Sequence, residues 1–263
     1  MKDRSVLLQI DSRGSATITL NRPDVHNCFD DTMVAGLERA IHDVVEHEDV
    51  RVTTLVSRGP TFSAGADLNW MREVADQSEA ANREDARQLG AMLNGLAQLP
   101  MPTVALVQGN AYGGGIGLIA ACDIVVAVKD CVFAFTEVNL GLTPSMISPF
   151  VVAAIGARQA RRYFVTGEKF DTYHAQRMGL IHEMVPTQGA LTAQGEYIVD
   201  QILQSAPGAV SKAKTLIADI VNKPVDKALM EDLARRIAAR RATDEGKEGM
   251  SAFLERRKPD WID

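Results

Sequence analysis

The sequence predicts an α/β body followed by a region made almost entirely of helices. Up to about residue 185, short apolar runs typical of buried strands alternate with amphipathic helical patterns, and this alternation favours an α/β fold. Beyond that point helical periodicity continues to the end of the chain. In a chain of 263 residues we therefore expect a core over residues 1–190 and a helical region over residues 191–263.

The core begins with two strands that form a hairpin. Residues 5–10 and 16–20 are strand-like and flank Arg13-Gly14, which is a turn signal. A helix that runs to His47 follows, with Asp30 or Asp31 as its N-cap. The remaining elements expected in the core are strands over residues 52–56, 103–107, 124–128 and 132–135, and a helix over residues 83–99 that Pro100 and Pro102 end.

Helical patterns dominate the chain after Ile147. The part after residue 185 could serve as a lid, as an oligomerisation element or as both, and the pattern alone does not choose between these roles. The expected helices cover residues 158–166, 172–178, 190–205, 207–221, 225–242 and 245–257.

Composition and charge argue against several classes of function. The formal net charge is −6, which disfavours nucleic-acid binding because that affinity comes from Lys and Arg. Cys28, Cys122 and Cys131 have no metal-ligand spacing, and we expect free thiols in a reducing compartment. The segment Met1–Ser5 shows no apolar leader, and no window is apolar enough to span a membrane. We therefore expect a cytoplasmic protein.

The segment Phe62–Leu68 follows the strand over residues 52–56 and reads Phe-Ser-Ala-Gly-Ala-Asp-Leu. Small residues followed by Asp67 predict a tight turn from a strand into a helix, where the first N–H groups of the helix point outward without partners. Because the helix dipole adds positive potential there, the N–H group of Ala66 could hold a developing oxyanion. An ordinary turn that caps a helix would give the same pattern.

The segment Gly109–Gly117 follows the strand over residues 103–107 and contains three consecutive glycines, Gly113–Gly115. Such a run costs backbone entropy, so a ligand, a neighbouring helix or a strained turn must need the close approach that glycine permits. The run leads into a short apolar helix, which predicts a second set of outward N–H groups. No Gly-Lys-Ser/Thr follows, so it is not a phosphate-binding loop, and it fits the dinucleotide fingerprint poorly. A packing turn is the alternative.

Glu137 stands at the end of an apolar strand, next to Phe135 and Val138. Desolvation in such surroundings raises the pKa of a carboxyl group, which suits an acid/base role near neutral pH. A solvent-facing glutamate on an edge strand is the alternative. No Ser-His-Asp or Cys-His arrangement can be assembled, and no cluster has metal-ligand spacing, so we expect no metal site.

Taken together and in order, these segments resemble the enoyl-CoA hydratase/isomerase (crotonase) family from about residue 5 to residue 261. Each motif alone is weak or moderate, whereas the ordered set is specific. The matching segments are Asn21-Arg22-Pro23 with His26-Asn27, then Ser63–Leu68, Gly113–Asp123, Glu137 with Gly141 and Pro144, and Ala252–Pro259.

The resemblance implies a crotonase-like spiral of β-β-α turns with a C-terminal helical trimerisation region, in a homotrimer or a dimer of trimers. It also implies an acyl-CoA thioester as substrate, with no separate cofactor. The N–H groups of Ala66 and Gly114 would form an oxyanion hole, and Glu137 would be the acid/base. Phe253 and Arg256 match positions that contact the nucleotide end of coenzyme A from a neighbouring subunit, or else belong to an amphipathic terminal helix. The other positions that match substrate contacts are His26, Asn27, Cys28, Ala64, Asp67, Leu68, Tyr112, Gly113 and Pro144.

One position departs from the family pattern. Hydratases of the family usually carry two glutamates, and the first would fall at position 117, which is Gly117 here. A single carboxylate can move a proton between carbons, as in an isomerase. It can also serve hydration, by taking a proton from water and donating one to the α-carbon. The missing role could fall to the substrate or to a polar group, for which the candidates are Tyr112, Asn139 and Ser145.

A finer resemblance favours hydration. Residues 110–115, 137–150 and 160–164 look like the bacterial methylglutaconyl-CoA and isohexenylglutaconyl-CoA hydratases of leucine and terpenoid breakdown. We therefore expect a hydratase of branched 2-enoyl-CoA thioesters, preferably 3-methylglutaconyl-CoA, with Arg72 as a candidate partner for its second carboxylate. The alternatives are a Δ3,Δ2-enoyl-CoA isomerase that uses Glu137 alone and an inactive acyl-CoA binder. RNA binding, found in a eukaryotic relative with a lysine-rich helix, is disfavoured because the early helix here is acidic.

Overall fold

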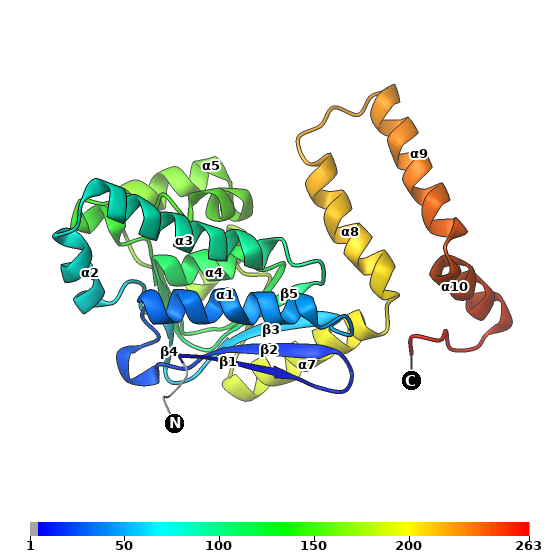
Figure 1. Cartoon of the computed structure of the whole chain (residues 1–263), viewed down its shortest axis with the longest axis horizontal. Helices are drawn as coiled ribbons and strands as arrows, with labels where there is room; N and C mark the ends of the chain where they lie inside the picture. The colour runs from blue at the N-terminus through cyan, green and yellow to red at the C-terminus, as the bar shows by residue number, and fades with distance from the viewer. Residues whose placement is uncertain (1–4, 263) are drawn as a thin grey trace.

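Two sheets form the body of the protein in a computed structural model that describes residues 5–262 (Figure 1). The segment Met1–Arg4, considered above for a leader, lies outside the described residues. The larger sheet has the order β1-β2-β3-β5-β7-β10, in which β1 and β2 form the predicted antiparallel hairpin and the other neighbours are parallel. Its strands are β1 (Val6–Ile10), β2 (Ser15–Leu20), β3 (Val52–Ser57), β5 (Thr103–Val107), β7 (Ile124–Val128) and β10 (Glu183–Val185).

The smaller sheet has the order β4-β6-β8-β9, in which β4, β6 and β8 are parallel to one another. Three times along the chain, a strand of the larger sheet is followed by a strand of the smaller sheet and then by helix; the pairs are β3–β4, β5–β6 and β7–β8. This repeat is the predicted β-β-α spiral. The strands of the smaller sheet are β4 (Thr61–Ser63), β6 (Asn110–Tyr112), β8 (Val132–Ala134) and β9 (Phe170–Asp171).

Helices that follow the strand pairs pack with the sheets around the main core. α1 (Asp31–Glu46) begins at its predicted cap, where the Asp30 carboxylate accepts a hydrogen bond from the Met33 N–H group (2.8 Å). Large side chains from both sheets and from these helices, among them Phe62, Phe133 and Leu93, are fully buried. The other helices of the body up to residue 177 are α2 (Leu68–Ala75), α3 (Glu79–Ala97), α4 (Gly114–Ala121), α5 (Ser148–Thr166) and α6 (Thr172–Arg177).

Two helices begin well before their predicted starts, and the four short strands β4, β6, β9 and β10 were not predicted. α3 starts at Glu79 because the Ser78 hydroxyl caps it by accepting from the Ala81 N–H group (3.3 Å). α5 starts at Ser148 and is kinked at Gly156, whose φ of 72° no helix adopts, so the helix predicted over residues 158–166 is its second half. β4 and β6 contain three residues each, which is too few to show a period.

α7 (Gln188–Leu203) packs against the larger sheet and builds a second, smaller core. The boundary expected at residue 190 falls within this helix. Because its apolar face is buried against the sheet, α7 is attached to the body rather than to the helices that follow. This second core consists of Val52, Val104, Val126, Leu191, Ile198 and Val199.

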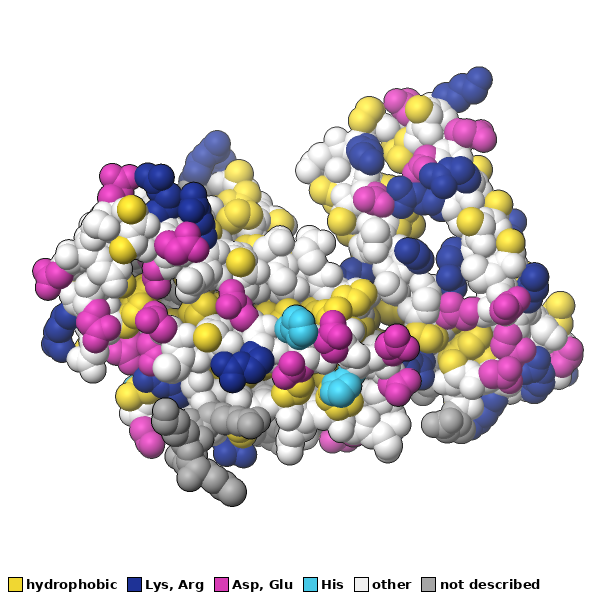
Figure 2. Space-filling model, viewed as in Figure 1, with side chains coloured by type: hydrophobic (Ala, Val, Ile, Leu, Met, Phe, Trp, Pro, Cys, Tyr) yellow, Lys and Arg dark blue, Asp and Glu magenta, His cyan; other side chains and the backbone are white. Residues whose placement is uncertain are grey.

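The three last helices form an arm that extends from the body (Figure 1). They are α8 (Pro207–Ile220), α9 (Lys227–Ala242) and α10 (Asp244–Glu255). α8 and α9 contain no buried residue. Figure 2 shows a hollow between the arm and the body and hydrophobic side chains on the surface of the arm. The arm therefore has little core of its own.

Polar contacts join the arm to the body at two places. On α8, Lys214 forms an ion pair with Asp123 (2.7 Å), which precedes β7. Arg51, which precedes β3, donates to main-chain carbonyls at the end of α7 and near the C-terminus; these belong to Leu203, Ser205 and Trp261. None of the helices within residues 5–262 combines the length and the apolarity that crossing a membrane requires.

Candidate active site

Three neighbouring strands of the smaller sheet end at one edge and lead to the three segments singled out in the sequence. β4 pairs in parallel with β6, and β6 pairs in parallel with β8. Since the carboxyl ends of parallel strands meet at the same edge of a sheet, the chain leaves all three strands into one region. Ala66 follows β4, Gly114 follows β6 and Glu137 follows β8.

The turn after β4 leaves the N–H group of Ala66 free. Phe29 forms a parallel bridge with this turn, in which its N–H group donates to the Gly65 carbonyl (2.7 Å) and its own carbonyl accepts from the Asp67 N–H group (2.8 Å). Successive N–H groups of extended backbone point to opposite sides, so that of Ala66 faces away from this pairing. No acceptor for it is found within residues 5–262, and Ala66 is solvent-exposed.

A second free N–H group belongs to Gly114, the first residue of α4. The first N–H groups of a helix have no acceptor within it, and none for Gly114 is found in the described part of the chain. Gly113 and Gly115 are buried, whereas Gly114 is partly exposed. The two turns also touch, because a Cβ atom on Gly65 would lie 3.1 Å from the Tyr112 carbonyl oxygen. The two free N–H groups therefore belong to adjoining turns.

The carboxyl group of Glu137 lies against the second of these turns. A Cβ atom on Gly113 would be 3.1 Å from Glu137 Oε1 and 3.9 Å from Oε2. Oε2 is buried, and no hydrogen-bond partner for it is found within residues 5–262. Desolvation raises the pKa of Glu137 above its ordinary 4.5 and outweighs a hydrogen bond to its own backbone, which lowers it. An acid that is protonated more easily than usual thus stands beside two free main-chain donors.

The sequence context predicted that Glu137 ends a strand, and this prediction is wrong. Glu137 opens a short 3-10 helix, η2 (Glu137–Leu140), which ends where Gly141 adopts a left-handed conformation (φ 74°). Because β8 stops at Ala134, the chain has already turned when it reaches the carboxylate. The turn is what brings the side chain back toward Gly113.

Arg22 joins the two helix starts that flank the first turn. Its Nη1 atom pairs with Asp30 Oδ2 (2.8 Å) and donates to the Cys28 carbonyl (2.9 Å), and its Nη2 atom pairs with Asp67 Oδ2 (3.4 Å). Asp30 caps α1 and Asp67 caps α2, so Arg22 ties the start of α1 to the residue that follows Ala66. No role of its own was predicted for Arg22, and its place in the motif Asn-Arg-Pro was the only signal for one.

The comparisons with known proteins show the family of this chain. The family described as enoyl-CoA hydratase/isomerase matches residues 11–263. The chain belongs to the enoyl-CoA hydratase/isomerase family. It is similar to the structures of a crotonase-family protein from Legionella pneumophila (40% identity, TM-score 0.95, 99% of this chain and 100% of that one) and of Pseudomonas aeruginosa AtuE (35%, 0.92, 98% and 100%). It is 28% identical to the 2,3-dehydroadipyl-CoA hydratase of Escherichia coli, over 93% of each chain.

Membership of the enoyl-CoA hydratase/isomerase family makes this chain an enzyme of acyl-CoA thioesters, within a family of carbon–oxygen lyases. The TM-score of 0.95 to a crotonase structure confirms the predicted fold.

One of the predicted substrate contacts, the side chain of Asn27, already makes three hydrogen bonds within the chain. It is buried, accepts from the Arg22 N–H group (2.9 Å) and donates to the carbonyls of Arg58 and Thr61 (2.9 Å each). His26 and Asn27 both adopt left-handed backbone conformations (φ 54° and 52°). The His26 Nδ1 atom lies 3.0 Å from Thr61 Oγ1. The side chain of Asn27 therefore supports the first turn and is not free to contact a ligand.

The other predicted contacts lie in two separate places. Leu68 is 71% exposed at the start of α2, and Asp67 caps the same helix. Phe253, 83% exposed, and Arg256 lie at the end of α10 on the arm, far from α2 in the same chain (Figure 1). Within one chain, the turns at Ala66 and Gly114 therefore lie together, whereas Phe253 and Arg256 lie far from them. Of the remaining residues near the turns, Cys28, Ala64 and Tyr112 are partly exposed and Pro144 is buried.

Gly117, where the family's hydratases usually carry their first glutamate, is packed by apolar side chains. A Cβ atom here would overlap the Cγ2 methyl group of Ile147, lie 3.0 Å from its Cβ and lie 3.6 Å from Leu93 Cδ1. A glutamate would therefore need Ile147 to move. No role was predicted for Ile147, because no local pattern links it to Gly117. The suggested stand-in Ser145 has its hydroxyl 2.6 Å from that of Thr143.

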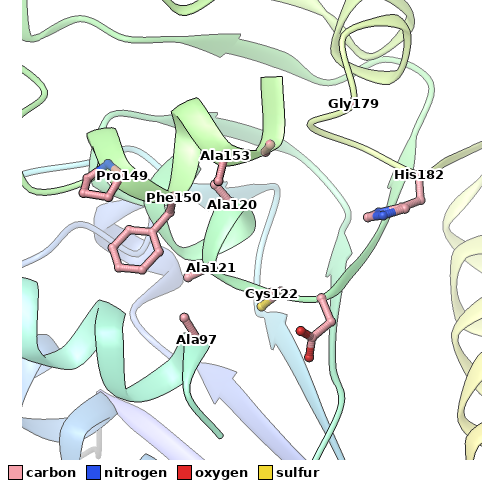
Figure 3. A pocket seen from close by; sticks show the side chains of 11 residues that line it. Ala97, Ala120, Ala121, Cys122, Pro149, Phe150, Ala153, Gly179 and His182 are labelled. Carbon is pink, nitrogen blue, oxygen red and sulfur yellow. The ribbon is translucent and has the colours of Figure 1, made fainter. Parts of the chain in front are cut away.

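A cavity of about 490 Å³ opens at the opposite end of α4 (Figure 3). Cys122, Phe150 and His182 are among its lining residues, and none of the predicted catalytic residues is. The His182 Nδ1 atom accepts from the Val125 N–H group (3.1 Å), so this nitrogen is already paired. The cavity is therefore separate from the three turns. Within residues 5–262 no three His, Cys, Asp or Glu side chains are arranged to hold a metal ion.

Proposed function

We propose that this enzyme is a hydratase that adds water across the 2,3 double bond of a branched enoyl-CoA thioester. The N–H groups of Ala66 and Gly114 bind the thioester oxygen. Glu137 takes a proton from water while the hydroxide oxygen bonds to C3, and the π electrons move to give an enolate. The carboxylic acid then returns its proton to C2. One water is consumed, and Glu137 ends as it began.

The observation that carries the proposal is the convergence of two free donors and one desolvated acid on one edge of the smaller sheet. Two preorganised N–H groups stabilise the charge that develops on the thioester oxygen, and losing one such donor typically slows a reaction by about 10²–10³-fold. A carboxyl group whose pKa is raised by desolvation is a better proton acceptor for a weak acid such as water. The two N–H groups and the carboxyl group of Glu137 therefore both favour the transition state of a reaction that forms an enolate.

We further propose that the acyl group carries a second carboxylate, as in 3-methylglutaconyl-CoA. The name of the Escherichia coli relative, 2,3-dehydroadipyl-CoA hydratase, describes an enoyl thioester with such a group. Arg72 lies on α2, which starts just after Ala66, and its Nη1 atom donates to Asn69 Oδ1 (2.9 Å). No ion pair of Arg72 is found in the described part of the chain, so its charge is available to a ligand.

A substrate panel tests the proposal. Purified enzyme is incubated with crotonyl-CoA, 3-hexenoyl-CoA and 3-methylglutaconyl-CoA, and the enoyl-thioester absorbance is followed. Loss of absorbance, fastest with the glutaconyl thioester, is the expected result. Arg72→Met should lower the preference for the dicarboxylate by roughly 10- to 100-fold, since a charge-assisted hydrogen bond contributes about 1.5–3 kcal/mol. Equal rates for the glutaconyl thioester and its methyl-ended analogue would refute the role of the second carboxylate.

One observation favours a Δ3,Δ2-enoyl-CoA isomerase as a second candidate. The packing of Ile147 on Gly117 leaves Glu137 without a second glutamate from the place where the family's hydratases have one. Moving a proton from C4 to C2 through a dienolate needs a single base, and it would use the same two N–H groups. Appearance of enoyl absorbance from 3-hexenoyl-CoA, without any loss from the 2-enoyl substrates, would select this function.

We also propose that the arm packs against other copies of the chain, in a trimer or a dimer of trimers. Many large apolar side chains exposed on one region of a protein are typical of an interface. The same packing would bring Phe253 and Arg256 toward the nucleotide end of a neighbour's coenzyme A. Light scattering should report at least a trimer, and a monomeric mass would refute the proposal. The exposed apolar side chains of the arm are Ile217, Ile220, Val221, Val225, Met230, Ile237, Met250, Phe253 and Leu254.

A further inference from the structure

Met146 and Ile147, which follow Glu137 in the chain, pack against glycines on two different helices. A Cβ atom on Gly117 of α4 would overlap the Cγ2 methyl group of Ile147 and lie 3.0 Å from its Cβ. A Cβ atom on Gly90 of α3 would overlap the terminal methyl group of Met146. Ile147 is 3% exposed and directly precedes α5. The start of α5 is therefore fixed against both α3 and α4.

Short hydrogen-bonded turns link this anchored point to the acid. The Leu142 N–H group donates to the Glu137 carbonyl (3.0 Å), and the Ser145 N–H group donates to the Thr143 carbonyl (2.7 Å). The hydroxyl groups of Thr143 and Ser145 are 2.6 Å apart. A displacement of Ile147 would therefore be passed along the segment instead of being absorbed by a flexible loop.

The carboxyl group itself has little else to hold it. Oε2 of Glu137 is buried and has no hydrogen-bond partner within residues 5–262. On its N-terminal side the segment is anchored by Phe135, whose ring packs against those of Phe164 (4.9 Å between centroids) and Phe170 (5.8 Å). With one end fixed in this aromatic cluster, the direction of the carboxyl group depends on where the other end is held.

We propose that Ile147 is a positioning residue for Glu137 and that Gly117 is the socket that receives it. The inference rests on the proposed function only in assigning proton transfer to Glu137. Filling the socket moves Ile147 and turns the carboxyl group away from the two N–H groups. The chemical step should then slow while the binding of the thioester changes little, because the socket lies on the buried side of α4.

The test uses Gly117→Ala, the double variant Gly117→Ala/Ile147→Leu, and the matched control Gly95→Ala. Leucine has no methyl group branching from Cβ, so the double variant removes the overlapping Cγ2 atom. Gly95 lies in α3, where an added Cβ would meet Ile41 Cγ2 at 3.5 Å, an ordinary contact. The assay is exchange of the α-hydrogens of butanoyl-CoA in D₂O, read by mass spectrometry. This reaction needs a base and an oxyanion hole but no double bond, so it reports on Glu137 even if hydration of every panel substrate fails.

Gly117→Ala should slow exchange by roughly 10- to 100-fold, the loss expected from a displacement of about 1 Å, with KM unchanged within about twofold. The double variant should recover most of the rate and the pH profile, and Gly95→Ala should match the wild-type enzyme. Folded Gly117→Ala with wild-type exchange, or a double variant no faster than Gly117→Ala, would overturn the proposal. If Gly117→Ala does not fold, the single variant Ile147→Leu tests the proposal through the pH profile of exchange. A shifted pH profile of exchange supports the proposal, and a profile identical to the wild-type one overturns it.

Discussion

Replacing Glu137 with glutamine tests the chemistry and the electrostatics of the site in one variant. The amide keeps the size of the side chain but cannot accept a proton. Loss of a general acid/base group typically slows turnover by about 10²–10⁴-fold. KM should change little, because the thioester oxygen is bound by main-chain N–H groups that the substitution leaves in place. Glu183→Gln, at an exposed position on β10, is the matched control and should keep wild-type turnover.

The same substitution should stabilise the fold, and by an amount that depends on pH. Desolvation raises the folded-state pKa of Glu137 above its ordinary value, so the ionised carboxylate opposes folding. At a pH below the unfolded-state pKa the group is protonated in both states and has no such effect. As the pH rises through the folded-state pKa, the wild-type protein loses stability that the glutamine variant keeps. An ionised group is costlier to remove from water than a neutral amide, and because Glu137 is only partly buried we expect a gain of about 1 kcal/mol.

Urea unfolding at about pH 4 and about pH 8, compared between wild-type and variant, measures this difference. The stability gain should be present at the higher pH and nearly absent at the lower one. A gain of equal size at both values would show that ionisation of Glu137 is not its cause. Turnover at the wild-type level would refute the catalytic role, whatever the stability measurements show.

Three further substitutions follow from contacts around the site. Gly113→Ala should reduce turnover by roughly 10²-fold, because its Cβ would lie 3.1 Å from a carboxyl oxygen of the acid at a φ of +47°; steady-state kinetics and a melting curve check this, and an active variant would refute it. Arg22→Met should lower the free energy of unfolding by about 1–3 kcal/mol and raise KM. Arg22→Lys should recover only part of the lost stability, because a lysine ammonium group cannot reach both Asp30 and Asp67 as the two Nη atoms of arginine do. Lys214→Met should lower stability by about 1–2 kcal/mol and speed hydrogen exchange in α8, since it removes the ion pair with Asp123.

Much of the fold could be predicted because its elements are long enough to show a period. The strands β3, β5 and β7 were predicted within a residue or two, and so was α1 with its Asp30 cap. The turn at Ala66 could be found because small residues before an aspartate are typical of a strand-to-helix turn. The choice of an oxyanion role for the Ala66 N–H group over an ordinary capping turn came only from the resemblance to the family, and that role stays a prediction.

Other features depend on contacts between segments that are distant in the sequence. β4 and β6 are strands because β4 pairs with β6 and β6 also pairs with β8, and three residues show no pattern alone. The three strand pairs leave no regular repeat in the sequence, because the helices that separate the pairs differ in length. The packing of Ile147 on Gly117 joins residues that lie on different elements, so nothing near either residue predicts it. The turn between Ala134 and Glu137 that redirects the acid was likewise not predicted, because the segment was expected to end a strand.

The glycine-rich segment after β6 shows how both kinds of information combine. Its sequence indicates that something must approach the backbone closely, without saying what. The structure places a different neighbour at each glycine: the Glu137 carboxyl group at Gly113, the Phe29 ring at Gly114, the Ser63 backbone and side chain at Gly115, and Ile147 at Gly117. A side chain at Gly113, Gly115 or Gly117 would collide with a part of the site or with its support. The run is therefore a meeting point of four chain segments, and this crowding is what allows one short helix start to face an acid and a second turn at once.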